Sequence, residues 1–399
     1  MLKRELYLNR IKGFFDSCDL VKILYGIRRC GKSVILEQIK NEISKKNDEE
    51  HIIYINFELL EYEEFTDYKK LHKYILSQIK DDKIYYVFLD EIGLVSNFEK
   101  VVNSLRARGN ISIFITGSNS KLTFAELSTE LSGRYVSFKI NPLSFKEIVE
   151  YTKTNKNDYL ELLYDIFKWG SLPRRFLIEN DRDKYTYITD VYNSIVLKDV
   201  VERLGIKDIT TFSKIFQYIL ETEGREFSQN NVINYLKNEN VIISTETLYR
   251  YLETLCSVFL INKVQRFDIH GKNVLKTLNK YYVTDLGIKN VRSRSEGREE
   301  YIALENIVYN ELILKDYEVY VGKNKKYEVD FVACKNGEYK YIQVALYIDN
   351  EETRDREFNA LKEIDDNYAK YLITLDKTDY SKDGIKHINI FEFLMNDDF

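Results

Sequence analysis

The chain has 399 residues, of which 44% are hydrophobic and 31% charged, and its net charge is -5. This length exceeds what one hydrophobic core usually supports, so we expect two to three domains. No apolar run reaches the ~18 residues that span a bilayer, and the first residues lack the apolar stretch of a secretory signal. We therefore expect a cytoplasmic protein without membrane contact, and the negative charge disfavours nucleic-acid binding by the protein as a whole.

Cysteine and histidine residues are few and scattered along the chain. They are Cys18, Cys30, Cys256, Cys334, His51, His72, His270 and His387. No CxxC pair or Cys/His cluster occurs, so the sequence predicts neither a zinc site nor a disulfide framework. We interpret these residues as core or surface residues, and no histidine-based mechanism is expected.

The first 142 residues alternate short apolar runs with segments of helical periodicity. This alternation is typical of an α/β fold, in which helices cover a parallel sheet. We expect strands at residues 20–25, 51–57, 84–89, 111–116 and 135–140. The second strand is a nearly continuous apolar run, which predicts burial on both faces.

A glycine-rich segment follows the first expected strand and leads into a helix. It matches the pattern GxxxxGK[ST] and comprises Gly26, Ile27, Arg28, Arg29, Cys30, Gly31, Lys32 and Ser33, with Val34 next. In such a P-loop the backbone N–H groups surround a phosphate and the helix N-terminus adds its dipole. We expect ATP here, with Lys32 reaching the β- and γ-phosphates and Ser33 binding Mg²⁺. A chance match on a strand-to-helix turn is the alternative.

The third expected strand ends in two acidic residues, Asp90 and Glu91. Ligands of open α/β sheets bind at the carboxyl ends of strands, which places both acids beside the P-loop. We predict that Asp90 is the magnesium-side carboxylate and that Glu91 orients or activates the attacking water. The alternative is an acidic strand end without chemistry.

Further polar residues could act on the phosphates. Ser118 or Asn119, at the end of the fourth strand, could contact the γ-phosphate, although turn formation explains them equally well. Arg134 could serve as an arginine finger for a neighbouring subunit, which predicts a homo-oligomer, and a surface ion pair is the alternative. Arg28, Arg29, Arg174 and Arg175 are other candidates for contacts with phosphate or acidic partners.

The remainder of the chain divides into three expected parts. Residues 143–206 suggest a helical lid, and residues 207–290 suggest three helices followed by a hairpin, the order of a winged helix. Residues 299–399 suggest a small, separate α/β domain.

Several motifs in combination resemble those of a known family. They are the P-loop, the Leu89-Asp90-Glu91-Ile92 strand end, Ile115-Thr116-Gly117-Ser118, Gly133-Arg134-Tyr135, Gly170-Ser171-Leu172-Pro173 and Thr284-Asp285-Leu286-Gly287. They resemble the large family of bacterial and archaeal AAA-type ATPases that carry a C-terminal domain of unknown function. The resemblance covers nearly the whole chain. It implies a nucleotide-binding core related to AAA+ and signal-transduction (STAND) switch ATPases, then a winged helix, then a restriction-endonuclease-like domain. It also suggests that Pro173 approaches the adenine.

A restriction-endonuclease-like site uses a helical acid, an Asp on one strand and [DE]-x-K on the next, so that carboxylates bind Mg²⁺ beside a lysine. Glu305 and Asp330 supply the first two elements. The third element is Gln343-Val344-Ala345, which lacks both the acid and the lysine. We therefore predict a catalytically degenerate centre.

The expected recognition helix of the winged helix covers residues 245–251. A thin set of cations lies near it: Lys237, Arg250, Lys263, Arg266 and Lys272. Packing against the rest of the protein explains such a module as well as DNA binding does.

Three hypotheses follow. The first is an ATP-hydrolysing switch whose nucleotide state repositions the C-terminal domains, with a protein partner that the sequence does not identify. The second is an ATP-gated DNA-binding regulator or defence protein. The third is a nuclease with an altered metal site.

Overall fold

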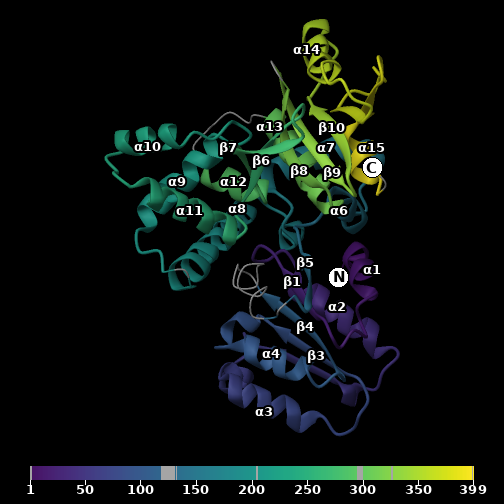
Figure 1. The fold of residues 1–399 in the computed structure, drawn as a ribbon, viewed down its shortest axis with the longest axis vertical. Coiled ribbons are helices and arrows are strands. Elements are labelled where there is room, and N and C mark those ends of the chain that lie inside the picture. The colour runs from purple at the N-terminus through teal and green to yellow at the C-terminus, as the bar shows by residue number, and fades with distance from the viewer. Residues whose placement is uncertain are drawn as a thin grey trace. The chain divides into compact units, whose positions relative to one another are not determined.

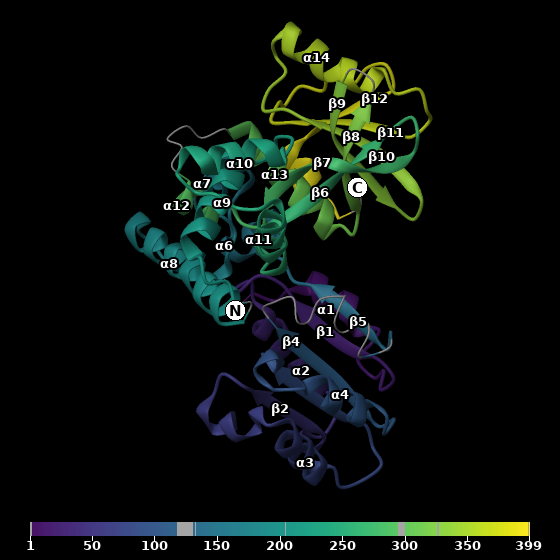
Figure 2. The same ribbon diagram turned by 60° about the vertical axis from the view of Figure 1, so that its left-hand side comes forward.

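The structure, a computed structural model, describes residues 2–117, 131, 133–203, 205–293, 300–324, 327–397 and 399 (Figures 1 and 2). The chain forms two compact units. One comprises Met1–Pro142 with Ser257–Phe259, and the other comprises Leu143–Cys256 with Leu260–Phe399. Within the described residues, no helix has the length and the apolar character needed to cross a membrane.

The first unit is built on a five-stranded parallel sheet in the order β2-β3-β4-β1-β5. The strands are β1 (Val21–Tyr25), β2 (Ile52–Asn56), β3 (Tyr85–Asp90), β4 (Ile111–Gly117) and β5 (Tyr135–Lys139). The expected α/β fold is confirmed, and each strand lies within a residue of its predicted bounds. The predicted burial of β2 on both faces is wrong, because β2 is an edge strand and its residues alternate between buried and half-buried.

Helices cover both faces of this sheet. They are α1 (Glu5–Lys12), α2 (Lys32–Ser44), α3 (Tyr68–Gln78) and α4 (Phe98–Arg106), with short 3₁₀ turns η1 (Glu49–His51), η2 (Leu60–Thr66) and η3 (Ile92–Leu94). Leu71 and Ile75 lie four residues apart on α3 and pack into the same core as Val101 and Leu105 of α4. Figure 1 shows α3 and α4 on one side of the strands and α1 and α2 on the other.

Lys22 is an unexpected member of this core. It is the second residue of β1 and is fully buried. Its Nζ donates hydrogen bonds to the carbonyl oxygens of Ser17 (2.6 Å) and Leu20 (3.0 Å) and to Oγ of Ser112 (2.8 Å). Burial lowers the pKa of the ammonium to about 8.

This lowered pKa predicts a pH dependence of stability. Between about 8 and the usual value of 10.5, the unfolded chain binds a proton at Lys22 that the folded chain releases. The free energy of unfolding should therefore rise with pH across this window, by at most roughly 3 kcal/mol, since one pKa unit corresponds to about 1.4 kcal/mol. Urea unfolding of wild type and Lys22→Met across the window measures this rise as a difference in slope. Equal slopes would contradict the prediction.

The second unit contains a seven-stranded mixed sheet in the order β12-β11-β10-β9-β8-β6-β7. Its strands are β6 (Ile261–Asp268), β7 (Asn273–Val283), β8 (Glu318–Asn324), β9 (Tyr327–Lys335), β10 (Glu338–Val344), β11 (Ala369–Thr374) and β12 (Ile385–Asn389). The hairpin expected for the winged helix is β6–β7. β12 was not predicted from the sequence.

The sequence suggests that the C-terminal strands form a separate domain. In the structure they do not. Arg266 to Asp268 of β6 pair in parallel with Val321 to Lys323 of β8, so the hairpin and the C-terminal strands share one sheet. Phe267 of β6 also packs in the core formed by β9, β10 and a C-terminal helix. The prediction of a separate unit is therefore wrong, because backbone pairing and apolar burial join the two segments.

The helices of this unit include three that precede the hairpin, in the order expected of a winged helix: α9 (Ile209–Glu221), α10 (Gln229–Asn238) and α11 (Thr245–Ser257). The others are α6 (Phe145–Thr152), η5 (Lys156–Asp158), α7 (Tyr159–Trp169), η6 (Pro173–Leu177), α8 (Asp181–Ser194), the π-helical η7 (Ile195–Arg203), α12 (Leu286–Arg292), α13 (Glu300–Leu314), α14 (Glu351–Lys362) and α15 (Ile390–Met395). α12 packs against α7 and α8 of the expected lid, so these segments belong to one compact unit.

Two motifs that carried the family resemblance pack together here. The buried carboxylate of Asp285 accepts hydrogen bonds from the backbone N–H groups of Ser171 (2.6 Å) and Gly287 (3.0 Å). Gly170 has φ 71°, and a Cβ there would lie 2.1 Å from Asp285 Oδ1. A side chain at Gly170 would therefore displace the carboxylate that joins the end of α7 to the start of α12.

Arg175 belongs to the same region and not to a phosphate site. It is 1% exposed, donates from Nε to the carbonyl of Gly170 (2.8 Å) and forms an ion pair with Asp165. The prediction that Arg175 contacts phosphate or an acidic binding partner is therefore wrong, because its guanidinium is buried inside the unit and paired with Asp165.

Candidate functional site

The P-loop connects β1 to α2 at the carboxyl edge of the parallel sheet. Gly26 has φ 152°, and a Cβ there would lie 2.2 Å from the carbonyl oxygen of Ile140. Gly31 has φ 104° and is the residue that precedes α2. Both positions therefore require glycine, one for close approach of the backbone and the other for a left-handed turn.

The side chain of Lys32 lies inside this loop. It is 5% exposed, and its Nζ donates hydrogen bonds to the carbonyl oxygens of Gly26 (3.1 Å) and Ile27 (3.2 Å). These neutral carbonyls are weaker partners for an ammonium than phosphate oxygens, which form charge-assisted hydrogen bonds. The loop thus holds a cation whose partners a phosphate could replace.

Asp90 is the meeting point of three hydroxyl groups. Its Oδ1 accepts hydrogen bonds from Oγ of Ser33 (3.0 Å) and from Oγ1 of Thr116, and its Oδ2 accepts one from the Tyr54 hydroxyl (3.2 Å). Asp90 is 1% exposed. Burial, and then the charge of Asp90, raises the pKa of Tyr54, so the phenol remains a donor. The fold therefore brings together the two predicted magnesium residues, Ser33 and Asp90, from separate elements.

Glu91 follows directly and has an unusual backbone. Its φ is 54°, in the left-handed region, and its backbone N–H donates to Oγ1 of Thr116 (2.9 Å). A glutamate in this conformation is uncommon, and such strain is found most often at functional sites. Glu91 is 8% exposed and adjoins Asp90 at the same sheet edge.

Arg4 holds the backbone of the P-loop in place, a role that was not predicted from the sequence. It is 2% exposed, and its guanidinium donates to the carbonyl oxygens of Cys30 (3.2 Å), Asn141 (3.2 Å) and Pro142 (3.5 Å). It therefore ties the P-loop to the segment that leaves β5. No local sequence pattern could have revealed this role, because the partners lie up to 138 residues away.

We expect Arg4→Met to lower the free energy of unfolding by about 2–4 kcal/mol, because each buried carbonyl left without a partner costs about 1–3 kcal/mol. Urea unfolding of the full chain measures the change. Lys12→Met, on the exposed end of α1, is the matched control and should leave stability near wild type. A fall no larger than that of the control would contradict this role.

Other predicted residues lie elsewhere. β5 runs parallel to β1, with Tyr135 opposite Val21. Arg134 therefore lies at the amino ends of these strands, whereas the P-loop lies at their carboxyl ends, roughly 15 Å away along the strand. Arg134 is exposed, and a role toward a neighbouring subunit stays a prediction. Ser118 and Asn119 lie outside the described residues. Pro173 belongs to the second unit, and its approach to adenine also stays a prediction.

Arg28 and Arg29 occupy different environments within the P-loop. Arg28 is buried, and its Nη1 lies 4.0 Å from Oε1 of Glu58. Arg29 is exposed and has a left-handed backbone with φ 68°. Their predicted contacts with phosphate remain predictions.

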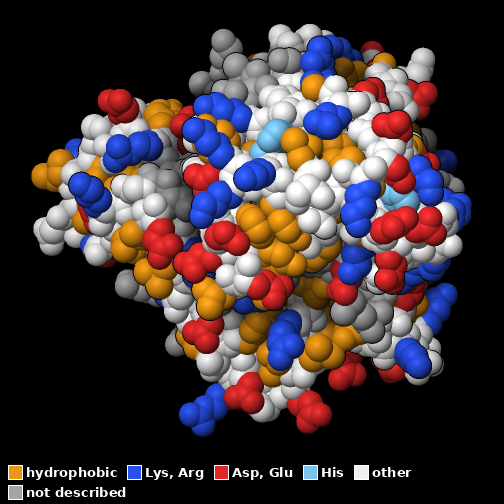
Figure 3. Space-filling view, turned by 90° about the horizontal axis from the view of Figure 1, so that it is seen from below, with side chains coloured by type: hydrophobic (Ala, Val, Ile, Leu, Met, Phe, Trp, Pro, Cys, Tyr) orange, Lys and Arg blue, Asp and Glu red, His pale blue; other side chains and the backbone are white. Residues whose placement is uncertain are grey.

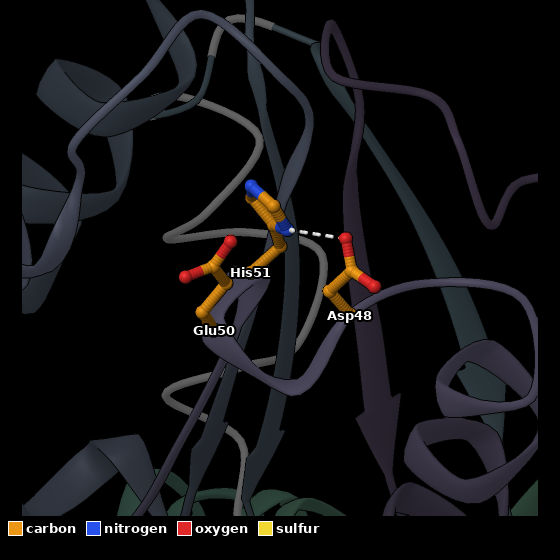
Figure 4. A group of neighbouring side chains, drawn as sticks. All are labelled: Asp48, Glu50 and His51. Atoms are coloured by element: carbon orange, nitrogen blue, oxygen red, sulfur yellow. Dashed lines mark ion pairs between the residues drawn. The ribbon is translucent and has the colours of Figure 1, made fainter.

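One group of potential metal ligands occurs in the part of the chain that the structure describes: Asp48, Glu50 and His51 (Figure 4). It lies at the start of β2, so it is at the amino ends of the strands, and the P-loop is at their carboxyl ends. His51 pairs with Asp81 (3.1 Å) and lies 3.9 Å from Asp48, which is 3.8 Å from Lys83. These ion pairs engage His51 and Asp48, and we assign the group no metal.

The centre implied by the restriction-endonuclease resemblance lies in the second unit. Glu305 of α13 and Asp330 of β9 are near each other, and the charge of Glu305 contributes to raising the pKa of Asp330, after burial. The lysine expected on β10 is absent, but Lys280 of β7 takes its place among these acids: its Nζ lies 3.5 Å from Glu305 and 2.6 Å from Glu328. The third element on β10 lacks the lysine, as its sequence indicates, but β7, which is distant in sequence, places a lysine among these acids.

The donor groups of this centre do not fit a bound Mg²⁺. The ammonium of Lys280 already contacts both Glu305 and Glu328. Gln343 uses its amide to donate to Glu357 (2.8 Å) and its oxygen to accept from the backbone N–H of Asp330 (3.2 Å). One oxygen each of Glu305, Glu328 and Gln343 thus already has a partner within the protein.

Comparison with known proteins agrees with this architecture. The model of the AAA domain family matches residues 19–149, which include the P-loop, Asp90 and Glu91. A domain of unknown function, DUF8612, matches residues 160–298.

Two relatives match most of the chain. An uncharacterized protein of Haemophilus influenzae is 37% identical over 99% of both chains, and the uncharacterized protein MJ1544 of Methanocaldococcus jannaschii is 32% identical over 93% of this chain and 84% of its own. Among solved structures, the Aeropyrum pernix ORC1 protein in complex with DNA aligns with 73% of this chain and 92% of its own, at 12% identity and a TM-score of 0.33, which is too low to bear on function. The chain therefore belongs to the family of AAA-domain proteins that includes the H. influenzae and M. jannaschii proteins.

Proposed function

We propose that the chain binds ATP with Mg²⁺ at the P-loop and hydrolyses it as a molecular switch. The observation that carries this proposal is the hydrogen bond between Ser33 and Asp90 (3.0 Å) beside the buried ammonium of Lys32. A hydroxyl and a carboxylate from two elements form an oxygen donor pair suited to Mg²⁺, next to a cation suited to phosphate.

Each residue has a distinct role in this proposal. The backbone of Gly26 to Lys32 surrounds the phosphates, and Lys32 exchanges its carbonyl partners for phosphate oxygens. Ser33 and Asp90 would hold Mg²⁺, which would neutralise charge on the phosphates. Tyr54 and Thr116 orient Asp90 by donating hydrogen bonds to its oxygens.

Glu91 orients the attacking water and accepts its proton as the water oxygen bonds to the γ-phosphorus. The bond from that phosphorus to the β–γ bridging oxygen breaks, and ADP leaves with the electron pair. Thr116 links this step to Asp90, because it accepts from the Glu91 N–H and donates to the Asp90 carboxylate. ATP binding at Asp90 and hydrolysis at Glu91 thus both act on the hydrogen bonds that join Asp90, Thr116 and Glu91.

The switch itself is a change in the separation of the two units with nucleotide state, driven by different contacts with ATP and ADP. Spin or fluorescent labels at Lys46→Cys and Glu363→Cys, with Cys18, Cys256 and Cys334 replaced by Ser, report this separation. ADP and a non-hydrolysable ATP analogue should give different distances, and Lys32→Ala should abolish the difference. Identical distances in the labelled parent would rule out the switch while leaving ATP hydrolysis open.

A homo-oligomer is part of the proposal because Arg134 lies too far from its own P-loop to contact the phosphate. In this arrangement Arg134 of one subunit stabilises charge in the site of the next. Sedimentation with and without the ATP analogue tests whether nucleotide promotes the assembly.

DNA binding is the alternative, and side-chain contacts count against it. Arg266 is buried and pairs with Glu226 (2.6 Å), and Lys272 pairs with Asp366 (2.6 Å). On the face drawn in Figure 3, lysine and arginine side chains are intermingled with acidic ones. A duplex titration across salt concentrations decides the matter, because phosphate contacts require affinity that falls steeply with salt.

A further inference from the structure

Lys280 lies among three acids of the second unit: Glu305, which is buried, and Glu328 and Asp330, which are half-buried. It projects from β7 and is 3% exposed. Its Nζ contacts Glu328 of β9 (2.6 Å) and Glu305 of α13 (3.5 Å). Glu305 also accepts a hydrogen bond from the hydroxyl of Tyr282, on the same strand as Lys280. One strand of the hairpin thus supplies both a cation and a hydroxyl donor to acids of the C-terminal segment.

We infer that the Lys280 ammonium is the resident cation of this centre, so that the centre takes no divalent metal ion, cleaves no nucleic acid, and instead locks the β6–β7 hairpin to α13 and β9. This role differs from that of the nuclease centres which the fold resembles, and it is independent of the P-loop.

Two neighbouring side chains, Asp330 and Gln343, support this assignment because they too have partners within the protein. Asp330 Oδ2 accepts from the backbone N–H of Val344 (2.8 Å). Gln343, at the position where a second acid is expected, bridges the backbone of Asp330 and the carboxylate of Glu357. Glu357 in turn pairs with Arg356 (2.7 Å). Binding a metal ion would require several of these contacts to break together.

Electrostatics argue against water activation by this lysine. Burial opposes the charge of Lys280, but the nearby carboxylates of Glu305, Glu328 and Asp330 outweigh it and raise the pKa of the ammonium. A lysine that accepts a proton during catalysis needs a lowered pKa. Burial raises the pKa of Glu305 and, more strongly, that of Asp330, which weakens both as metal ligands.

The first test compares Mn²⁺ binding by nucleotide-free wild type and Asp330→Asn, using calorimetry or electron paramagnetic resonance. Both should bind Mn²⁺ equally, because the centre contributes no site. An additional saturable Mn²⁺ in wild type that Asp330→Asn abolishes would overturn the inference. Mn²⁺-dependent cleavage of DNA or RNA that disappears in Asp330→Asn would do the same.

The second test removes the lysine. Lys280→Met should lower the melting temperature by several degrees, because the buried carboxylate of Glu305 and the half-buried one of Glu328 lose their cation. Mn²⁺ should restore part of this loss in Lys280→Met and leave wild type unchanged. Lys263→Met, on the exposed side of β6, is the matched control and should behave as wild type. A Lys280→Met protein as stable as wild type would contradict the lock, and if this variant does not fold, the Asp330→Asn comparison still decides whether metal binds.

Discussion

Lys32→Ala should weaken ATP binding at least roughly 100-fold. The ammonium is held inside the P-loop by two backbone carbonyls and is poised to form charge-assisted hydrogen bonds with two phosphate groups. Each such bond contributes about 1.5–3 kcal/mol, so their loss corresponds to at least a roughly 100-fold weaker Kd. Equilibrium binding of labelled ATP to the purified chain measures the change.

The control for this variant lies on the same helical segment. Lys45→Ala removes an exposed lysine whose ion pair with Glu42 (2.8 Å) lies on the surface, so ATP affinity should stay close to wild type. A melting curve for Lys32→Ala separates loss of binding from loss of fold. If folded Lys32→Ala binds ATP as tightly as wild type, the P-loop assignment fails.

Glu91→Gln should bind ATP normally and hydrolyse it about 100- to 10,000-fold more slowly, the range expected when a general base is removed. Glutamine keeps the size of the side chain and tolerates the left-handed backbone about as well as glutamate, so the fold should be unaffected. Single-turnover hydrolysis separates this effect on chemistry from any effect on ATP binding or ADP release.

Glu63→Gln, an exposed acid on η2, is the matched control for the loss of one negative charge in the same unit. It should leave turnover unchanged. If Glu91→Gln hydrolyses ATP at the wild-type rate, another group positions the water and Glu91 has only a structural role.

The P-loop and the two acids were predictable because each is encoded in a short stretch of sequence. Gly26 and Gly31 mark backbone conformations that other residues avoid, and the apolar run before Asp90 marks a buried strand. The position of the acids beside the loop follows from the carboxyl-edge rule for parallel sheets. The hydrogen bond between Ser33 and Asp90 shows that the P-loop helix and the end of β3 meet as this rule predicts.

Contacts between distant segments were not predictable by the same means. Arg4, Tyr54 and Thr116 complete the nucleotide site through partners far away in sequence, and no local periodicity encodes such pairs. The pairing of β6 with β8 likewise depends on which sheet edge the hairpin meets. Lys280 was overlooked because its strand was assigned to another domain, although it neutralises acids of the C-terminal segment.

ATP turnover by wild type, measured with Mg²⁺ and with EDTA alongside the binding of labelled ATP, tests the central claim most directly. The account predicts that ATP binds, that phosphate is released with Mg²⁺, and that chelation stops the release because Ser33 and Asp90 then hold no cation. A well-folded wild-type chain that binds no ATP, or that hydrolyses it equally well in EDTA, would contradict the proposed site.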